Sequence, residues 1–234
     1  MNLLAIDSAA QILSVAVSKG DEIFYMETDA LMRQSELVMG FIDNLMKQAA
    51  LKPCDLNGVL CMGGPGSFTG LRIGYSIAKG LALSLSIPFA PVPTLDCIVS
   101  KLKDNCDASA NPYLQLAVIQ ARKNAYFYAF FRGGERLTSD ADAAPDQIAE
   151  EISQFDEQII MTGPGSALLY DSIQFDLRKN IKLENKTGGY AKEIIFIAKK
   201  LNMPDNGSTV SLFSGPEYIR KTDAELNLSE KDGI

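Results

Sequence analysis

A glycine-rich stretch at residues 63–74, Gly-Gly-Pro-Gly-Ser-Phe-Thr-Gly-Leu-Arg-Ile-Gly, holds the residues of this chain that are best placed to do chemistry. A short apolar run at residues 59–62 precedes it and indicates a buried strand, while helical spacing begins at Leu71. Glycines between a strand and a helix can turn backbone N–H groups toward a phosphate or a carboxylate. However, no lysine follows Gly70, as a phosphate-binding loop requires, and Gly70 comes one residue late for a dinucleotide fingerprint. The stretch therefore predicts either tight packing of strand on helix or an anion site.

The chain has no histidine, and this limits the chemistry that it can perform. Ser-His-Asp and Cys-His catalytic sites are excluded, as is a zinc site of the His-Glu-x-x-His kind. Metal sites made of carboxylates alone, and acid–base chemistry by Asp, Glu, Lys or Tyr, remain open. The four cysteines have no Cys-x-x-Cys spacing, which favours free thiols in a reducing compartment.

Composition narrows the class of protein further. A length of 234 residues, of which 47% are hydrophobic, suits one large domain or two small ones with an ample core. A net charge of −7 argues against unaided binding to nucleic acid or to an anionic membrane. The apolar runs are too short to cross a bilayer, and the N-terminus lacks the basic start of a signal peptide. We therefore expect a cytoplasmic protein with no membrane partner.

Two helices, over residues 35–50 and 71–86, are predicted on either side of the strand that leads into the glycine-rich stretch. The second helix carries two apolar strips: a large one formed by Ile73, Ile77, Leu81 and Leu85, and a small-residue one formed by Gly74, Ala78 and Ala82. A helix that is apolar nearly all round is buried on more than one side. We expect the large strip to pack on a sheet and the small strip to admit another helix, from this chain or from a partner.

The order of predicted elements occurs twice along the chain. Three strands, a helix, a strand, a glycine-containing turn and a helix come before residue 103, and the same order follows residue 112. In the second half, Gly163-Pro164-Gly165-Ser166 stands where the glycine-rich stretch stands in the first. We therefore predict an α/β chain of two lobes, with an N-terminal lobe over residues 1–103 and a C-terminal lobe with a tail over residues 104–234.

Three blocks of this sequence together resemble the TsaB family, and the resemblance runs from residue 1 to about residue 220. They are Leu-Leu-Ala-Ile-Asp-Ser at residues 3–8, the glycine-rich stretch with Lys79-Gly80, and Pro-Glu-Tyr-Ile-Arg at residues 216–220. The resemblance implies an actin-like, ribonuclease-H-like fold of two lobes, each a mixed sheet flanked by helices. It also implies a subunit that works with TsaD and TsaE in making threonylcarbamoyladenosine beside the tRNA anticodon. In that family TsaD carries the metal and the chemistry, so no catalytic residue is expected here.

The resemblance also places the contact with TsaD on the helices at residues 35–50 and 71–86. The residues expected at this partner interface are Met32, Ser35, Met39, Gly40, Arg72, Gly74, Tyr75, Ala78, Lys79 and Ala82. When TsaD is absent, the same surface could pair two copies of this chain, and tRNA is reached only indirectly through the complex. Arg72 could bind an anion, pair with a carboxylate across the interface or remain solvated. Arg220 and Lys221 could brace the tail or reach TsaE or tRNA.

In ATPases of the implied fold, an acidic residue at the end of the first strand of each lobe manages metal and phosphate. Asp7 has that position in the first lobe, but Gln120 stands at the second, where an amide leaves a magnesium site short of a carboxylate. Candidate nucleotide-binding or anion-binding residues are Asp7, Gly64, Gly66, Ser67, Thr69 and Gly70. The other interpretation of Asp7 is a strand-end carboxylate bonded to a nearby N–H. Ser67 or Thr69 could cap the helix that follows.

We expect no metal and no cofactor in this chain alone, with ATP and magnesium entering only at the level of the complex. The alternative function is an independent ATP-dependent phosphotransferase of the sugar-kinase-like class. The family often has His-Ser before its first helix, where this chain has Gln34-Ser35, and the expected capping by Ser35 survives that change. A zinc-protease activity, once attached to relatives of TsaD, is discounted for lack of histidine.

Overall fold

The first lobe is built on a five-stranded sheet with the strand order β3-β2-β1-β4-β5. A computed structural model describes residues 1–102, 113–184, 186, 188–203 and 215. The elements of this part are β1 (Leu3–Asp7), β2 (Ile12–Lys19), β3 (Glu22–Asp29), α1 (Gln34–Gln48), a 3-10 turn (Pro53–Asp55), β4 (Gly58–Gly64), α2 (Phe68–Leu85), β5 (Phe89–Pro93) and α3 (Thr94–Ser100). Every residue of β1 and β4 is buried, as expected of central parallel strands that are covered on both faces.

The second lobe repeats this plan. Its elements are β6 (Leu114–Arg122), β7 (Ala125–Arg132), β8 (Glu135–Arg136), β9 (Ala141–Ala143), α4 (Pro145–Ile152), β10 (Ile159–Thr162), α5 (Ser166–Ser172), α6 (Phe175–Arg178), β11 (Ile181–Leu183) and α7 (Ala191–Lys200). The sheet order is β11-β10-β6-β7-β8, and β9 pairs with β7. In each lobe the first strand pairs antiparallel with the second and parallel with the strand that follows the helix. The predicted duplication is confirmed, and the fold is the actin-like, ribonuclease-H-like one.

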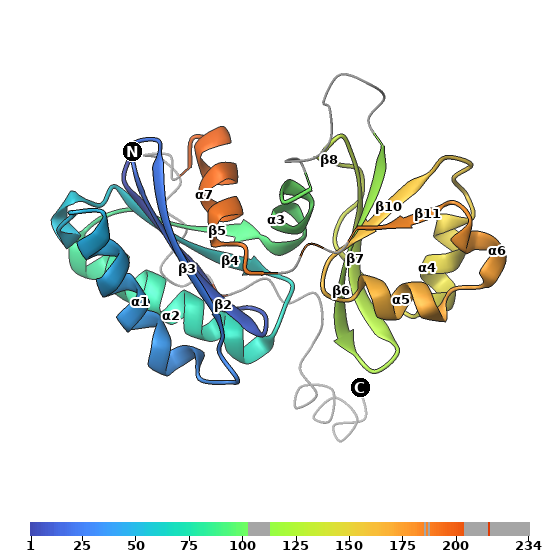
Figure 1. Ribbon diagram of the computed structural model, residues 1–234, viewed down its shortest axis with the longest axis horizontal. Coiled ribbons are helices and arrows are strands. Elements are labelled where there is room, and N and C mark those ends of the chain that lie inside the picture. Colours follow the sequence, from blue (N-terminus) through green and yellow to red (C-terminus); the bar gives the residue numbers. More distant parts are fainter. Residues whose placement is uncertain (103–112, 185, 187, 204–214, 216–234) are drawn as a thin grey trace, which may run out of the picture.

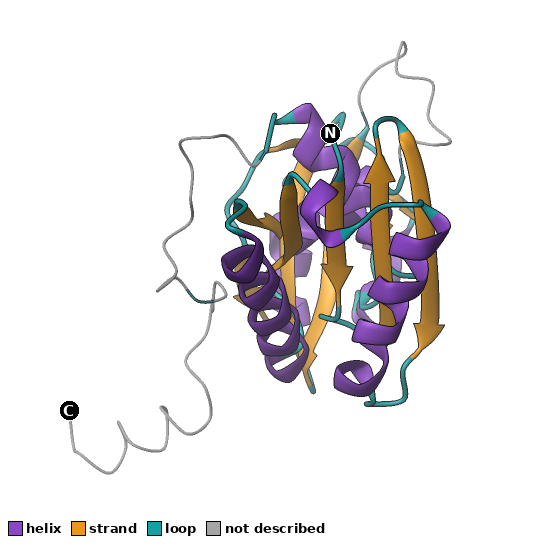
Figure 2. Cartoon of the chain, turned by 90° about the vertical axis from the view of Figure 1, so that its left-hand side faces the viewer, coloured by secondary structure: helices purple, strands orange, loops and turns teal. Residues whose placement is uncertain are grey.

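Helices cover both faces of the first sheet (Figures 1 and 2). On one face, α1 and α2 pack with β1, β2 and β4 around a core that includes Val38, Leu45, Ala78 and Ala82. On the other face, α7 and α3 pack around a second core. In the second lobe, α4 and α5 pack on the outer face of the sheet. Of the helices in the described ranges, none combines the length and apolar character needed to span a bilayer.

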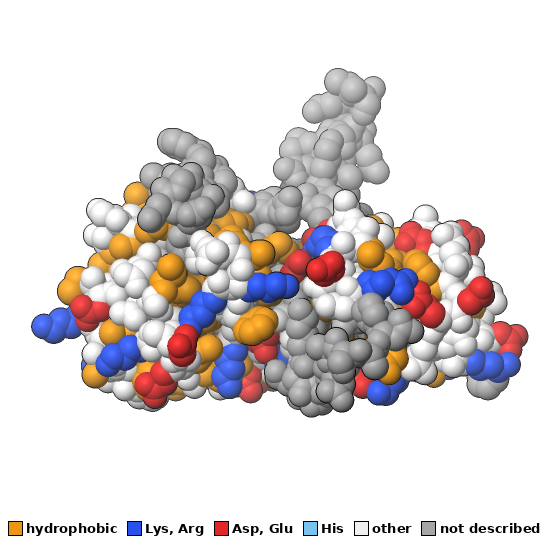
Figure 3. Space-filling view, turned by 90° about the horizontal axis from the view of Figure 1, so that it is seen from above, with side chains coloured by type: hydrophobic (Ala, Val, Ile, Leu, Met, Phe, Trp, Pro, Cys, Tyr) orange, Lys and Arg blue, Asp and Glu red, His pale blue; other side chains and the backbone are white. Residues whose placement is uncertain are grey.

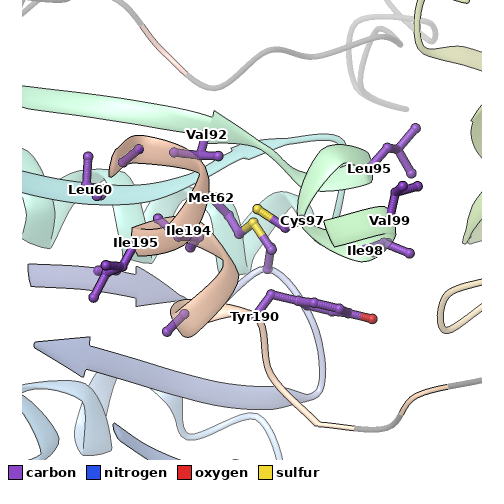
Figure 4. Packing of buried hydrophobic residues seen from close by; sticks show 14 of the residues in the cluster. Leu60, Met62, Val92, Leu95, Cys97, Ile98, Val99, Tyr190, Ile194 and Ile195 are labelled. Carbon is purple, nitrogen blue, oxygen red and sulfur yellow. The ribbon is translucent and has the colours of Figure 1, made fainter. Parts of the chain in front are cut away.

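The terminal helices of the two halves tie the lobes together. Although α7 follows β11 of the second sheet, its residues Ala191, Ile194 and Ile195 pack in one core with Leu3 and Leu60 of the first sheet. The same core contains Ile98 of α3 and Phe131 of β7, so it is continuous across both lobes. Figure 4 shows its part between β4, β5, α3 and α7. The predicted division at residues 103 and 104 assigned α7 to the second lobe, whereas in the structure this helix packs on the first sheet. The boundary segment, residues 104–112, lies outside the described residues.

Aromatic residues on β7 fill both cores that border the second sheet. Tyr126, Tyr128 and Phe130 point into the core beneath α4, while Phe131 faces the core shared with α3 and α7. All four side chains are buried. The aromatic strand is therefore a central strand covered on both faces, as its sequence indicates.

Candidate functional site

The glycine-rich stretch folds as a tight connection between β4 and α2, packed against the end of β1. A Cβ on Gly70 would lie 2.0 Å from the carbonyl oxygen of Ser8, so only glycine fits there. The Ser8 hydroxyl donates a hydrogen bond of 2.8 Å to the Gly70 carbonyl, and Ser67 N donates to the Ala9 carbonyl. Ser67 caps α2, because its Oγ accepts a hydrogen bond from Gly70 N, whereas Thr69 lies inside the helix. Of the two interpretations of the glycine-rich stretch, these contacts agree with tight packing of the strand on the helix.

Asp7 lies at the carboxyl end of β1 and is completely buried. Its Oδ2 accepts hydrogen bonds from Tyr190 N at 2.8 Å and from the Ser14 hydroxyl at 3.4 Å, while Oδ1 accepts one from Ala9 N at 3.2 Å. Burial raises the pKa of the Asp7 carboxyl to about 6, although these hydrogen bonds act in the opposite direction. The carboxylate is thus engaged by the chain itself.

A small pocket lies between the lobes next to Asp7. Its walls are Asp7, Ala9, Ala10, Met62, Gly66, Thr94, Ile98, Ile119, Pro164 and Tyr190. The pocket is partly open to solvent and has room for little more than a water molecule, so it is far smaller than a typical small-molecule site. Of the six candidate nucleotide-binding residues, it brings Asp7 and Gly66 to one wall, while Gly64, Ser67, Thr69 and Gly70 do not line it.

The second glycine turn closes the other side of this region. Gly163 has a φ of +108°, and a Cβ there would lie 2.3 Å from the Val118 carbonyl oxygen. A Cβ on Gly165 would lie 2.5 Å from Gln120 N, so this turn also packs directly on the preceding strand. The Gln120 side chain is exposed on β6. Among the described residues, no cluster of three or more Cys, Asp and Glu side chains could hold a metal ion.

The small-residue strip of α2 faces the sheet, which reverses the expected roles of its two strips. Gly74, Ala78 and Ala82 are buried, and a Cβ on Gly74 would lie 2.8 Å from Ser8 Oγ. The large strip, Ile73, Ile77, Leu81 and Leu85, is only half-buried. Small side chains let the helix approach β4 closely, so they take the inner face. Gly74, Tyr75, Ala78 and Ala82, which were expected at the partner interface, are therefore buried against this chain itself.

One further prediction about α1 is corrected by the structure. Ser35 does not cap the helix, because α1 begins one residue earlier, at Gln34, after Arg33, and no side chain caps it. Met32, which is expected at the same interface as Met39, precedes the helix in a turn with a φ of +70°. Met32 is nevertheless 85% exposed, and Ser35, Met39 and Gly40 are exposed too. Met46 is buried in the core.

The outer faces of α1 and α2 expose apolar side chains, two of which, Phe68 and Leu83, the sequence prediction did not single out. Phe68 and Leu83 are 37% and 55% exposed on α2, and Met39 is 49% exposed on α1. Leu37 and Phe41 of α1 are half-buried beside the same core. Arg72 lies over the Phe68 ring at 3.9 Å, and Lys79 lies over the Tyr75 and Phe89 rings. The sequence could have indicated the exposure of Leu83, since this leucine belongs to neither of the two apolar strips of the helix. The predictions for Arg220 and Lys221 lie outside the described residues.

Comparison with known proteins gives this fold and site a family. A family profile described as "TsaD: tRNA N6-adenosine threonylcarbamoyltransferase" matches residues 28–227. A Bacillus subtilis protein named tRNA threonylcarbamoyladenosine biosynthesis protein TsaB is 25% identical over 235 residues, covering 98% of this chain and 99% of its own length. The Escherichia coli protein of the same name is 26% identical over 170 residues, covering 70% of this chain and 72% of its own length.

Solved structures show the same architecture. A Pseudomonas aeruginosa protein described as similar to peptidase YEAZ superposes with a TM-score of 0.79 at 20% identity, covering 94% of this chain and 99% of that one. An inorganic polyphosphate/ATP-glucomannokinase from Arthrobacter shares the fold more distantly, with a TM-score of 0.51 at 14% identity, covering 85% of this chain and 99% of that one. The chain therefore belongs to the family that the matching profile describes and is a member of the TsaB proteins, with a role in tRNA threonylcarbamoyladenosine biosynthesis.

Proposed function

We propose that this chain is a non-catalytic subunit that pairs with TsaD, and through that complex works with TsaE, in threonylcarbamoyl transfer to the tRNA adenosine beside the anticodon. The observation that carries the proposal is the apolar surface on the outer faces of α1 and α2. Met39, Phe68 and Leu83 are exposed there by 49%, 37% and 55%. Exposed apolar patches on globular proteins are typical of contacts with other proteins.

Two glycines support a contact in which a partner helix lies close to these helices. Gly40 of α1 and Gly80 of α2 are exposed, and a Cβ built on either of them meets nothing within 4 Å. Glycine inside a helix is less favourable than alanine by about 1 kcal/mol. Nothing in the described part of the chain requires these two glycines, whereas a partner helix packed against the backbone would use the space that they leave.

The interior supports a division of labour in which TsaD supplies the chemistry. The Asp7 carboxylate is occupied by Tyr190 N, Ala9 N and the Ser14 hydroxyl, and an amide stands at Gln120. We propose that this chain alone binds no cofactor and no metal. ATP and magnesium would be held only at the level of the complex.

The apolar surface of α1 and α2 and the net charge of the chain also indicate how it would meet its other partners. In the absence of TsaD, the outer faces of α1 and α2 would pair with those of a second copy. Figure 3 shows acidic and basic side chains interspersed on one face of the molecule, and the chain carries a net charge of −7. We propose that tRNA meets this chain only through the complex, because an acidic protein repels the phosphate backbone. The proposal places the chain in the cytoplasm, with its tRNA substrate.

Co-elution with TsaD in size-exclusion chromatography tests the pairing. Met39→Glu/Leu83→Glu should abolish co-elution, because it puts two charges into an apolar contact. Leu168→Glu is the matched control, since Leu168 is 51% exposed on α5 of the second lobe, and it should co-elute as the wild type does. Unchanged co-elution of the double variant would contradict the proposed surface, and a wild-type chain that never binds TsaD would contradict the pairing itself.

The alternative of an independent ATP-dependent phosphotransferase rests on Asp7, the two glycine turns and the duplicated fold. It would require the Asp7 carboxylate to give up the hydrogen bond from Tyr190 N in order to reach a magnesium ion. Calorimetric titration of the isolated chain with ATP and magnesium separates the two functions. The scaffold function predicts no binding, whereas tight binding that is lost in Asp7→Asn would favour the phosphotransferase.

A further inference from the structure

Side chains from the first sheet and from the end of α3 converge on the start of α7 and on the two glycines that precede it. Gly189 N donates a hydrogen bond of 2.7 Å to Glu27 Oε2, and Lys101 Nζ donates one of 2.9 Å to the Gly189 carbonyl oxygen. The next two backbone N–H groups are also engaged: Tyr190 N donates to Asp7 Oδ2 at 2.8 Å, and Ala191 N to Ser14 Oγ at 3.0 Å. We name Asp7, Ser14, Glu27 and Lys101 the α7 clasp.

The backbone of Gly188 and Gly189, just before α7, packs closely against the clasp residues. Gly188 has a φ of +103°, and a Cβ there would lie 2.8 Å from Glu27 Oε2. A Cβ on Gly189 would lie 2.3 Å from Ser14 Oγ. Only glycines therefore let the backbone come close enough to make these hydrogen bonds.

The clasp fixes the point at which the chain, coming from the second sheet, joins the first lobe. The segment leaves β11 at the far edge of the second sheet and enters α7, which packs on the first sheet. In the opposite direction, α3 leaves β5 of the first sheet and packs against β6 and β7. Figure 4 shows residues of α3 and α7 meeting around Met62 and Tyr190 in one packed cluster. Each lobe is thus held by the terminal helix of the other half.

We propose that the α7 clasp holds the two lobes in one relative orientation without any bound ligand. The backbone N–H groups at the start of α7, which could receive a phosphate, are taken by the protein's own Asp7, Ser14 and Glu27. The fold therefore needs no nucleotide between its lobes to fix them. This inference goes beyond the pairing proposal and does not depend on it.

The energetics of Asp7 agree with such a role. A fully buried carboxylate costs free energy, and burial raises its pKa to about 6. A position that served only to fill space would be occupied more favourably by an apolar residue. At Asp7, a carboxylate that accepts two backbone N–H groups and a hydroxyl is kept in spite of that cost.

Distances between spin labels on the two lobes test the proposal. One label is placed at Asn44→Cys on α1 and the other at Glu150→Cys on α4, both exposed, in a chain with Cys54 and Cys106 changed to serine. With the wild-type clasp, pulsed electron–electron double resonance should give one narrow distance distribution that does not change when ATP and magnesium are added. Asp7→Ala/Glu27→Ala should widen that distribution at least twofold. Glu22→Ala, an exposed carboxylate on the same strand as Glu27, is the matched control and should leave it narrow.

Either of two results would overturn the proposal: a wild-type distribution that shifts with ATP and magnesium, or a double variant as narrow as the wild type. If circular dichroism shows that the double variant does not fold, Ser14→Ala and Glu27→Gln, which each weaken the clasp, replace it. Hydrogen exchange is then the measurement. The amides of Gly189 and Ala191 should exchange at least tenfold faster in these variants, while those of α4 stay unchanged. Equal exchange in the wild type and both variants would equally overturn the proposal.

Discussion

The backbone N–H of Tyr190 donates a hydrogen bond of 2.8 Å to Oδ2 of Asp7, across 183 positions of sequence. Asp7 ends the first strand, and Tyr190 immediately precedes the last helix that the structure describes. The carboxylate that ATPases of this fold direct at metal and phosphate is here directed at the protein's own backbone. This hydrogen bond holds the start of α7 on the first sheet, and the engaged carboxylate supports a scaffold role for the chain.

The pH dependence of stability should report the burial of Asp7. Its pKa is raised from 3.8 to about 6 on folding, so the folded state binds the proton more tightly than the unfolded state does. The resulting stabilisation is fully present below pH 3.8 and is lost as the pH rises through 6. As the pH rises from 5 to 7.5, the contribution of Asp7 to the free energy of unfolding should therefore fall by about 1.4 kcal/mol.

Urea denaturation of the wild type and of Asp7→Asn at pH 5 and 7.5 measures that contribution. The difference in stability between the two proteins should change by about 1.4 kcal/mol over this range in favour of the variant at the higher pH. Glu22→Gln, at an exposed carboxylate, should show no comparable change. A constant difference between wild type and Asp7→Asn would contradict the raised pKa.

Alanine at two glycines of α2 should have opposite effects on stability. Gly70→Ala places a Cβ 2.0 Å from the Ser8 carbonyl oxygen and should destabilise the fold by about 3 kcal/mol. Gly80→Ala meets open space inside a helix and should stabilise it by about 0.5–1 kcal/mol. Thermal unfolding of the two variants gives both values. If Gly80→Ala also weakens binding to TsaD, a close helix contact at that position is supported.

Glutamate at two apolar positions of α2 separates its inner and outer faces. Ala78 is completely buried, so Ala78→Glu should destabilise the chain by about 4 kcal/mol or prevent folding. Leu83 is 55% exposed, and Leu83→Glu should change the free energy of unfolding by less than about 0.5 kcal/mol. Chemical denaturation of both isolated proteins checks this, and similar stabilities would mean that the helix faces are assigned wrongly.

An ion pair between the lobes should contribute a measurable coupling. The Arg136 guanidinium of β8 bonds Asp96 of α3 and also Asp140, and it lies over the Phe131 ring. The paired groups are about 30% exposed, so a coupling of about 1 kcal/mol is expected. A double-mutant cycle with Arg136→Ala and Asp96→Ala measures it at low and high salt. A coupling of zero would remove this ion pair from the contacts that join the lobes.

Local patterns were sufficient to predict the two-lobed fold, because each lobe repeats one order of strands, glycine turn and helix. The capping of α2 by Ser67 and the burial of the aromatic strand followed from local chemistry in the same way. The prediction placed the large strip of α2 on the sheet, whereas the structure has the small-residue strip there. The helical period determines which residues share a face, but not which face meets the sheet. That choice depends on how closely the helix approaches β4, which Ser8 and Gly74 decide together.

Contacts between distant segments lay beyond the reach of sequence patterns. Nothing near Ser14 or Glu27 indicates that they bind the backbone before α7, since their partners are more than 160 residues away. The position of α7 on the first sheet is likewise a matter of topology, because its apolar stripe would suit either sheet. The turn before α1, formed by the positive φ angles of Leu31 and Met32, was likewise not indicated by the sequence pattern.

Modification of tRNA in a reconstituted system tests the central claim most directly. TsaD and TsaE are supplied with the threonylcarbamoyl donor, ATP, magnesium and unmodified tRNA, and the modified nucleoside is measured by mass spectrometry. A non-catalytic scaffold predicts that product requires this chain, that Asp7→Asn supports it as well as the wild type does, and that Met39→Glu/Leu83→Glu does not. Full product formation without the chain, or loss of product in a folded Asp7→Asn protein that still binds TsaD, would contradict the account.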